Sequence, residues 1–210
     1  MLCVVQARCG SKRLNRKIFE KIKNISIIER VLNNLKKSKK ISKIIIATSK
    51  TKEDDEIEFF CKRKNINFYR GSLNNVASRY LEVANKHKAK QILRVSCDSP
   101  FISPYLIDRG IKKFYANKIH LLTNVFPRTY PKGLSFEIFK TYILNKNIKK
   151  FTKNDKEHVT TFFYKNYKKF KILNISAKNK HKNINLCVDT KEDLNFLRKN
   201  YRYISLRKFL

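Results

Sequence analysis

The sequence predicts a three-layer α/β fold with a mainly parallel sheet. Short β-rich runs alternate with helical patterns along the chain, and the loops between them are short. The run Lys43–Thr48 is continuously apolar, as in a strand that is covered on both faces. The chain has 210 residues and no Pro-rich or Gly/Ser-rich linker, so we expect a single domain over residues 1–210.

Strands are predicted where apolar and β-branched residues cluster. In chain order they are Leu2–Gln6, Lys43–Thr48, Asn67–Arg70, Gln91–Ser96, Ile119–Val125, Ser135–Phe139, Lys171–Ser176 and Asn185–Val188. Ligands of such sheets bind at the carboxyl ends of the strands, so the residues that follow these runs are the candidates for a site.

Helices are predicted from apolar periodicity and from capping residues. Ser26 and Glu29 have the spacing of a capping box, and Ile27–Leu35 continues the helical pattern. The other predicted helices are Glu53–Arg63, one capped by Asn74 or Asn75, one from about Pro104, Glu157–Tyr167, and one that Thr190 caps with Asp193 in its first turn.

The net charge of +33, from 49 Lys and Arg against 16 Asp and Glu, has two interpretations. One is a nucleic-acid-binding protein that neutralises phosphates, with the aromatic residues of 162–170 stacking on bases. The other is compositional bias, because the chain is rich in Lys, Asn and Ile and its lysines are spread evenly. The even spread favours bias, and the helical spacing of 162–170 favours a core face, so no specific nucleic acid is expected.

The lack of a long apolar run and of a signal-peptide pattern at Met1–Val5 predicts a cytoplasmic protein without membrane insertion. No stretch approaches the roughly 20 apolar residues of a membrane span. The five cysteines lack the close spacing of a zinc site, and Cys3, Cys97 and Cys187 lie in strand-like runs where a reduced thiol is a small hydrophobe.

A basic turn follows the first strand. Over Ala7–Lys17 it carries Arg8, Lys12, Arg13, Arg16 and Lys17, with Gly10 and Ser11 among them. A triphosphate needs fixed positive charge and close donors, and a glycine lets the backbone approach a phosphate. The turn lacks the second glycine and the Lys-Ser/Thr pair of a Walker A loop.

Two acids follow strand-like runs: Asp98 after Gln91–Ser96, and Asp189 after Asn185–Val188. Mg²⁺ in proteins takes one or two carboxylates together with substrate phosphates, so the pair fits a Mg²⁺ site if the two acids meet in space. The alternative is that each acid caps the helix that follows it.

The sequence as a whole resembles the cytidylyltransferases, in particular those of the spore coat polysaccharide biosynthesis protein F type. The synthetases that make CMP-activated 3-deoxy-manno-octulosonate and CMP-acylneuraminate are related to these proteins. The segments that carry the resemblance are Val4–Lys17, Tyr69–Ser72, Arg94–Pro100, Asn124, Arg128–Leu134, Glu137, Glu157–Thr160 and Val188–Leu194.

The resemblance implies a Rossmann-like nucleotide-diphospho-sugar transferase fold and the transfer of CMP from CTP to a sugar acid of the ulosonic type, for a surface polysaccharide or glycan. It implies Arg8, Arg13, Lys17 and Asp98 as catalytic residues, and Mg²⁺ on Asp98 and Asp189. Nucleotide contacts would come from Ala7, Arg8, Gly10, Ser11, Arg13, Lys17 and Gly71. Acceptor contacts would come from Arg128, Glu137, Glu157 and His158, and the protein would be a homodimer.

Several positions depart from the family pattern. The family has Pro and Gly where this chain has Asn15 and Arg16, and it tends to have acids where this chain has Asn75, Lys132 and Ser135. These departures leave open the alternative of a catalytically inactive family member.

Overall fold

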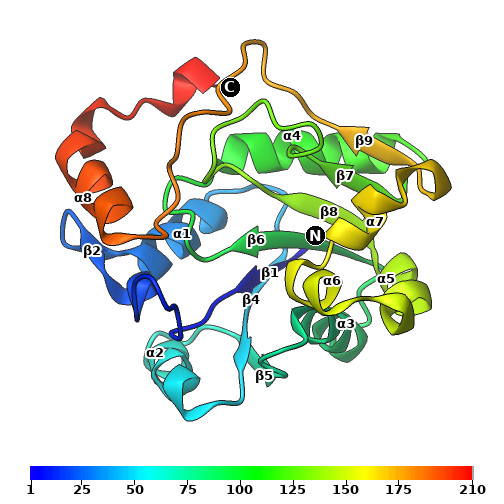
Figure 1. Cartoon of the computed structure of the whole chain (residues 1–210), viewed down its shortest axis with the longest axis horizontal. Helices are drawn as coiled ribbons and strands as arrows, with labels where there is room; N and C mark the ends of the chain where they lie inside the picture. Colours follow the sequence, from blue (N-terminus) through cyan, green and yellow to red (C-terminus); the bar gives the residue numbers. More distant parts are fainter. Residues whose placement is uncertain (210) are drawn as a thin grey trace.

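The computed structural model describes residues 1–209 and contains a seven-stranded sheet in the order β5-β4-β1-β6-β8-β7-β9 (Figure 1). Its strands are β1 Leu2–Gln6, β4 Lys43–Ser49, β5 Phe68–Gly71, β6 Gln91–Ser96, β7 Leu121–Thr123, β8 Glu137–Lys140 and β9 Ile172–Asn174. Only β8 runs against its neighbours β6 and β7, and the other pairs are parallel. The predicted mainly parallel α/β sheet is therefore confirmed.

Helices cover both faces of the sheet and form two hydrophobic cores (Figure 1). One core lies under α1 Ile27–Lys36, α2 Asp55–Arg63, α4 Pro104–Ala116 and α8 Lys191–Asn200. The other lies under α3 Val76–Lys86, α5 Thr141–Asn147, α6 Lys153–His158 and α7 Thr161–Lys165. Within residues 1–209, no helix is long and apolar enough to cross a membrane.

The three helix caps predicted from the sequence are present in the structure. Ser26 and Glu29 form a capping box at α1, and Thr190 and Asp193 form one at α8. Asn75 caps α3 by accepting a hydrogen bond from the Ser78 amide. Ser103, just ahead of Pro104, accepts from the Leu106 amide at the start of α4.

Two predictions from the sequence need correction, and one element was missed. The helix predicted over Glu157–Tyr167 is broken at Val159, where φ is +59°, so α6 ends at His158 and α7 begins at Thr161. The strand predicted over Asn185–Val188 is, in the described chain, only an isolated bridge between Asn185 and Lys132, because its amides bond to loop carbonyls. A small hairpin, β2 Lys21–Ile22 and β3 Ile25–Ser26, was not predicted.

The aromatic segment 162–170 belongs mainly to the second core. Phe163 is fully buried, and Phe162, Tyr164 and Phe170 pack against the same cluster. Phe163 and Phe170 meet edge to face, with their ring centroids 5.0 Å apart. These rings pack inward as a core face, as predicted, although Tyr167 remains exposed.

Gly110 provides a test of the packing between α4 and the sheet. A Cβ atom at Gly110 would lie 2.5 Å from Cε2 of the buried Phe136 ring. Alanine normally stabilises a helix interior relative to glycine by about 1 kcal/mol, but overpacking typically costs about 1–3 kcal/mol. We expect Gly110→Ala to lower the free energy of unfolding, measured by urea denaturation.

The double variant Gly110→Ala/Phe136→Leu is the control, because the smaller side chain makes room for the new methyl group. Its free energy of unfolding should be higher than the value obtained by adding the two single-variant changes to the wild-type free energy. Strict additivity would show that Gly110 and Phe136 are not in contact.

Candidate active site

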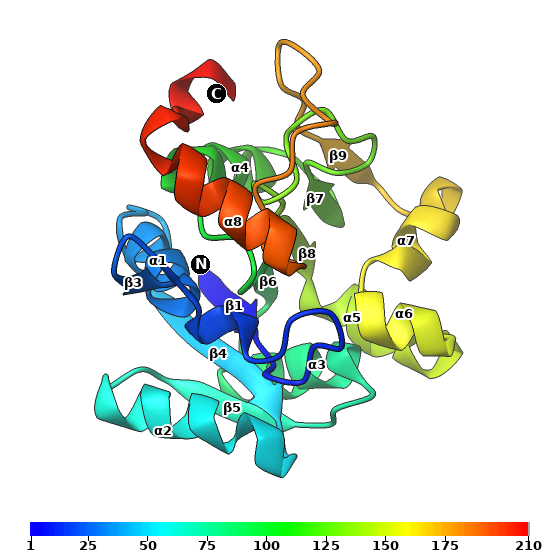
Figure 2. The ribbon, with the colours of Figure 1, turned by 60° about the vertical axis from the view of Figure 1, so that its left-hand side comes forward.

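A cavity of about 330 Å³ opens at the carboxyl ends of β1 and β6. Figure 2 shows the surrounding elements: the blue loop after β1 passes between α8 and α3, with α6 close by. The cavity is lined by Gln6, Ala7, Arg8, Ser11, Arg13, Lys17, Ile18, Val76, Arg79, Arg94, Ser96, Cys97, Asp98, Glu157, His158 and Asp189. It lies where parallel α/β sheets bind their ligands.

The basic loop after β1 is anchored by a buried acid. One carboxylate oxygen of Asp54 accepts a hydrogen bond from the Cys9 amide at 2.7 Å, and the other accepts from the Ser49 amide at 3.0 Å. Asp54 is only 1% exposed, so both bonds are shielded from water. The loop is thereby tied to the end of β4, which holds its basic side chains over the cavity.

Arg16 stands where the family pattern has glycine, and its contacts explain how the turn forms without that glycine. Its φ is +53°, in the left-handed region that glycine occupies without a steric penalty. Here the Arg16 amide donates to the Cys9 carbonyl at 3.0 Å, and its guanidinium pairs with Glu56. The turn is therefore retained without the glycine.

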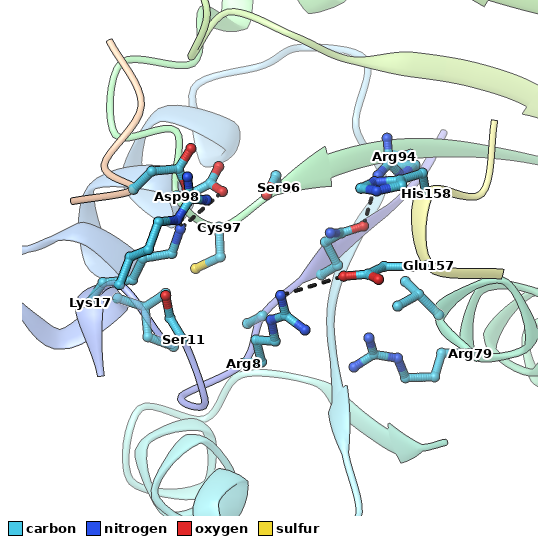
Figure 3. A pocket seen from close by; sticks show the side chains of 16 residues that line it. Arg8, Ser11, Lys17, Arg79, Arg94, Ser96, Cys97, Asp98, Glu157 and His158 are labelled. Carbon is cyan, nitrogen blue, oxygen red and sulfur yellow. Dashed lines mark hydrogen bonds and ion pairs between the residues drawn. The ribbon is translucent and has the colours of Figure 1, made fainter. Parts of the chain in front are cut away.

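Asp98 and Asp189 meet at the ammonium group of Lys17, as Figure 3 shows for Asp98 and Lys17. The Lys17 Nζ lies 2.7 Å from Asp189 Oδ1 and 3.4 Å from Asp98 Oδ2. The Val188 amide donates to the Asp98 carbonyl at 2.9 Å and so holds the two acid-bearing segments together. Neither acid is a helix cap, because Ser103 caps α4 and Thr190 caps α8.

The electrostatics of this cluster favour its charged forms. Burial disfavours the charge on Lys17, but Asp98 and Asp189 outweigh that effect and raise the pKa of its ammonium group. Burial also opposes the charge on Asp189, yet Lys17 and Arg13 lower the pKa of its carboxyl group. The two carboxylates already bind one cation, so they fit the ligand count of Mg²⁺ bound with phosphates. Among residues 1–209, no group of three or more His, Cys, Asp or Glu side chains could hold a metal ion.

The opposite side of the cavity carries Glu157 and His158, at the end of α6 (Figure 3). Arg8 reaches across from the basic loop, with its Nη2 3.6 Å from Glu157 Oε1. Both side chains of this pair are about half exposed, at 49% each, so the contact contributes little stability. A ligand in the cavity can replace it at low cost.

Arg79 is a site residue that the sequence analysis missed. It is 2% exposed and lines the cavity, but its Nε has no partner among the described residues. Its Nη1 makes one long bond, 3.5 Å, to the Ala47 carbonyl. A buried guanidinium with so few acceptors is costly unless a ligand supplies them. The available signal was an arginine on the otherwise apolar face of α3, beside Val76 and Tyr80.

The structure brings together most of the residues predicted for the site. Those that line the cavity are Ala7, Arg8, Ser11, Arg13, Lys17, Asp98, Glu157, His158 and Asp189. Those outside its lining, within the described chain, are Gly10, Gly71, Arg128 and Glu137. A Cβ atom at Gly71 would lie 2.7 Å from Cγ of Arg79, so this glycine makes room for a cavity residue. Arg128 donates to Ser135 Oγ at 2.8 Å, and Glu137 is buried behind the cavity.

Residues 2–206 match the family described as cytidylyltransferase. The chain belongs to the cytidylyltransferase family. The resemblance inferred from the sequence is therefore confirmed.

Two curated proteins are similar to part of this chain. An uncharacterised protein of Methanocaldococcus jannaschii is 37% identical over 140 residues, which are 65% of this chain and 55% of that protein. The spore coat polysaccharide biosynthesis protein SpsF of Bacillus subtilis is 29% identical over 119 residues, 55% of this chain and 50% of that one. The matched region thus spans about half the length of these curated relatives.

Solved structures show the same fold. A cytidylyltransferase from Leptospira borgpetersenii serovar Hardjo-bovis superposes with a TM-score of 0.91 at 30% identity, over 99% of this chain and 88% of that one. A CMP-2-keto-3-deoxy-manno-octonic acid synthetase in complex with CTP gives a TM-score of 0.72 at 14% identity, over 96% and 98% of the two chains. At that identity the second likeness supports the fold alone, and it agrees with the predicted nucleotidyltransferase architecture.

The start of α6, the helix that carries Glu157 and His158, makes a pH-dependent contribution to stability. Asp155 is 2% exposed, and its burial alone would raise the pKa of the carboxyl group. Hydrogen bonds from Thr152, Lys165 and Thr161 outweigh burial and lower this pKa from 3.8 to about 2. A depressed carboxyl pKa stabilises the fold above the unfolded-state pKa, and this stability is lost as the pH falls. We expect Asp155→Asn to lower the free energy of unfolding by about 2 kcal/mol at pH 7.

The deficit of the Asp155→Asn variant should shrink between about pH 4 and pH 2, as the wild-type carboxylate is protonated. Urea denaturation of both proteins across this range measures it. A deficit that does not change with pH would contradict the assigned bonds.

Proposed function

We propose that this chain transfers CMP from CTP to a sugar acid of the ulosonic type and releases pyrophosphate. The observation that carries the proposal is the meeting of Asp98 and Asp189 at one cation, directly beside the basic loop. Family membership supports the use of CTP. The printed names of two relatives, a spore coat polysaccharide protein and a synthetase of a CMP-activated sugar acid, support the acceptor class.

In this proposal the two sides of the cavity divide the work. Arg8, Ser11, Arg13 and Lys17 bind the phosphates and stabilise the charge of the departing pyrophosphate. The Ala7 amide is bonded to the Ala47 carbonyl at 3.1 Å, so these side chains supply the phosphate contacts. Arg79, which lies over Gly71, donates to the nucleoside. On the opposite side, Glu157 and His158 bind the acceptor, since both line the cavity. Arg128 is not among the described residues that line it, so it is not assigned this role.

The proposed reaction is a single displacement. An acceptor hydroxyl oxygen forms a bond to the α-phosphorus, the bond from that phosphorus to the pyrophosphate oxygen breaks, and the hydroxyl proton passes to His158. No covalent intermediate with the protein is needed, since positioning and charge neutralisation account for the catalysis. When bound at Asp98 and Asp189, Mg²⁺ supplies further charge neutralisation at the phosphates. We propose that the active protein is a homodimer, as the family resemblance implies.

The Asp98→Asn variant tests the proposal. Pyrophosphate release is measured with CTP, Mg²⁺ and either 3-deoxy-manno-octulosonate or an acylneuraminate as the acceptor. The wild-type protein should release pyrophosphate with one of these acceptors, and the variant should lose at least about 100-fold in turnover, because one carboxylate ligand is gone. Its circular dichroism spectrum should match that of the wild type.

Asp108→Asn is the matched control. Asp108 lies on α4 outside the cavity, where it accepts a bond from the Lys39 amide at 3.0 Å. This variant should keep wild-type turnover. Unimpaired turnover by Asp98→Asn would refute the metal assignment. Tight CTP binding by a wild-type protein that turns over neither acceptor would identify an inactive family member.

A further inference from the structure

The backbone at Val159 adopts a strained conformation directly beside the cavity. Its φ and ψ are +59° and −59°, and the Thr160 amide donates to the His158 carbonyl at 2.6 Å. This is a classic γ-turn, which is rare and strained, and Val159 is a fully buried β-branched residue. Such a turn persists only where its surroundings hold it. The two residues that precede it, Glu157 and His158, line the cavity.

The buried carboxylate of Glu137 holds this turn. Its Oε1 accepts a hydrogen bond from Thr160 Oγ1 at 2.7 Å and another from the Tyr164 hydroxyl at 3.0 Å. Thr160 is 2% exposed and Glu137 is 4% exposed, so water does not compete for these bonds. Burial, followed by the charge of Glu137, raises the pKa of Tyr164, which keeps its hydroxyl protonated and able to donate.

The same carboxylate is connected to the floor of the cavity. Its Oε2 accepts from Arg94 Nη1 at 2.6 Å, and Arg94 Nη2 donates to Gln6 Oε1 at 3.0 Å. Arg94 and Gln6 both line the cavity, Arg94 from within β6 and Gln6 from the end of β1. Figure 3 shows Arg94, Glu157 and His158 on the side of the cavity away from Lys17 and Asp98. Glu137 thus joins the sheet to the turn.

Charge neutralisation of Arg94 does not account for this arrangement. The pair with Arg94 uses only one oxygen of Glu137, and the other oxygen receives Thr160 and Tyr164. Thr160 is the residue that closes the γ-turn, so its side chain and its amide together determine where α6 stops and α7 starts.

We propose that Glu137 is a positioning residue whose carboxylate, through Thr160, holds the strained turn at Val159 and so sets Glu157 and His158 at the acceptor side of the cavity. The acceptor part of this inference rests on the proposed function. Glu137 was predicted from the sequence to contact the acceptor. In this proposal it does not contact the acceptor, and it acts on Glu157 and His158 through Thr160.

Thr160→Val is the test variant, because it removes the hydroxyl donor, keeps the shape of the side chain and leaves the Arg94–Glu137 pair intact. Thr160→Ser is the matched control, since it keeps the donor. In the free protein, the amide hydrogen of residue 160 should exchange about tenfold faster in Thr160→Val than in the wild type. The reason is that the variant loses the hydrogen bond from residue 160 to the Glu137 carboxylate. The ring signals of His158, one of four histidines, should shift in its NMR spectrum. Thr160→Ser should match the wild type in both respects.

In turnover assays, Thr160→Val should raise the KM for the acceptor by about tenfold, while CTP affinity stays at the wild-type value. Wild-type amide exchange in Thr160→Val would overturn the inference, and so would faster exchange with an unchanged acceptor KM. If the wild-type protein turns over no acceptor, the proposed function fails. The exchange rate and the His158 signals then decide the positioning role by themselves.

Discussion

The contact of Lys17 with Asp98 and Asp189 is the interaction on which the site depends. Two carboxylates held close together repel each other, and a cation between them offsets that repulsion. Lys17 provides that cation from the basic loop, and it thereby joins the end of β6, the segment before α8 and the loop after β1. The contact also supports the proposed metal site, because a place that holds an ammonium group between two carboxylates suits a divalent cation with phosphates.

Buried acids elsewhere in the chain hold the segments that form the cavity. Asp54 anchors the basic loop, Glu137 holds the turn at Val159, and Asp155 completes the capping box of α6 with Thr152. The chain has only 16 acidic residues against 49 basic ones. These three are buried, and each accepts hydrogen bonds, as a buried carboxylate requires. In a protein of such high positive charge, the few buried carboxylates are therefore better guides to the architecture of the site than the many lysines.

The sequence predicted the sheet and the cavity residues of the basic loop better than the surroundings of Glu157 and His158. The bounds of β6 and the capping box at Ser26 agree with the structure because they depend on local patterns. The break at Val159 could not be predicted, since the helical pattern continues through it and the contact that causes it comes from Glu137, far away along the chain. Arg79 was missed because its position on α3 belongs to an apolar face, and only the structure shows that its guanidinium is buried with few acceptors.

The central claim, that this cavity binds CTP together with a divalent cation, is tested most directly by calorimetric titration of the wild-type protein. CTP, UTP, ATP and GTP are titrated with and without Mg²⁺ at about 0.3 M salt, where the surface charge is largely screened. The structure and the family predict Mg²⁺-dependent binding that is selective for CTP. Equal and weak binding of all four nucleotides, unchanged by Mg²⁺, would contradict the account and would redirect attention to nucleic-acid binding by the net charge of +33.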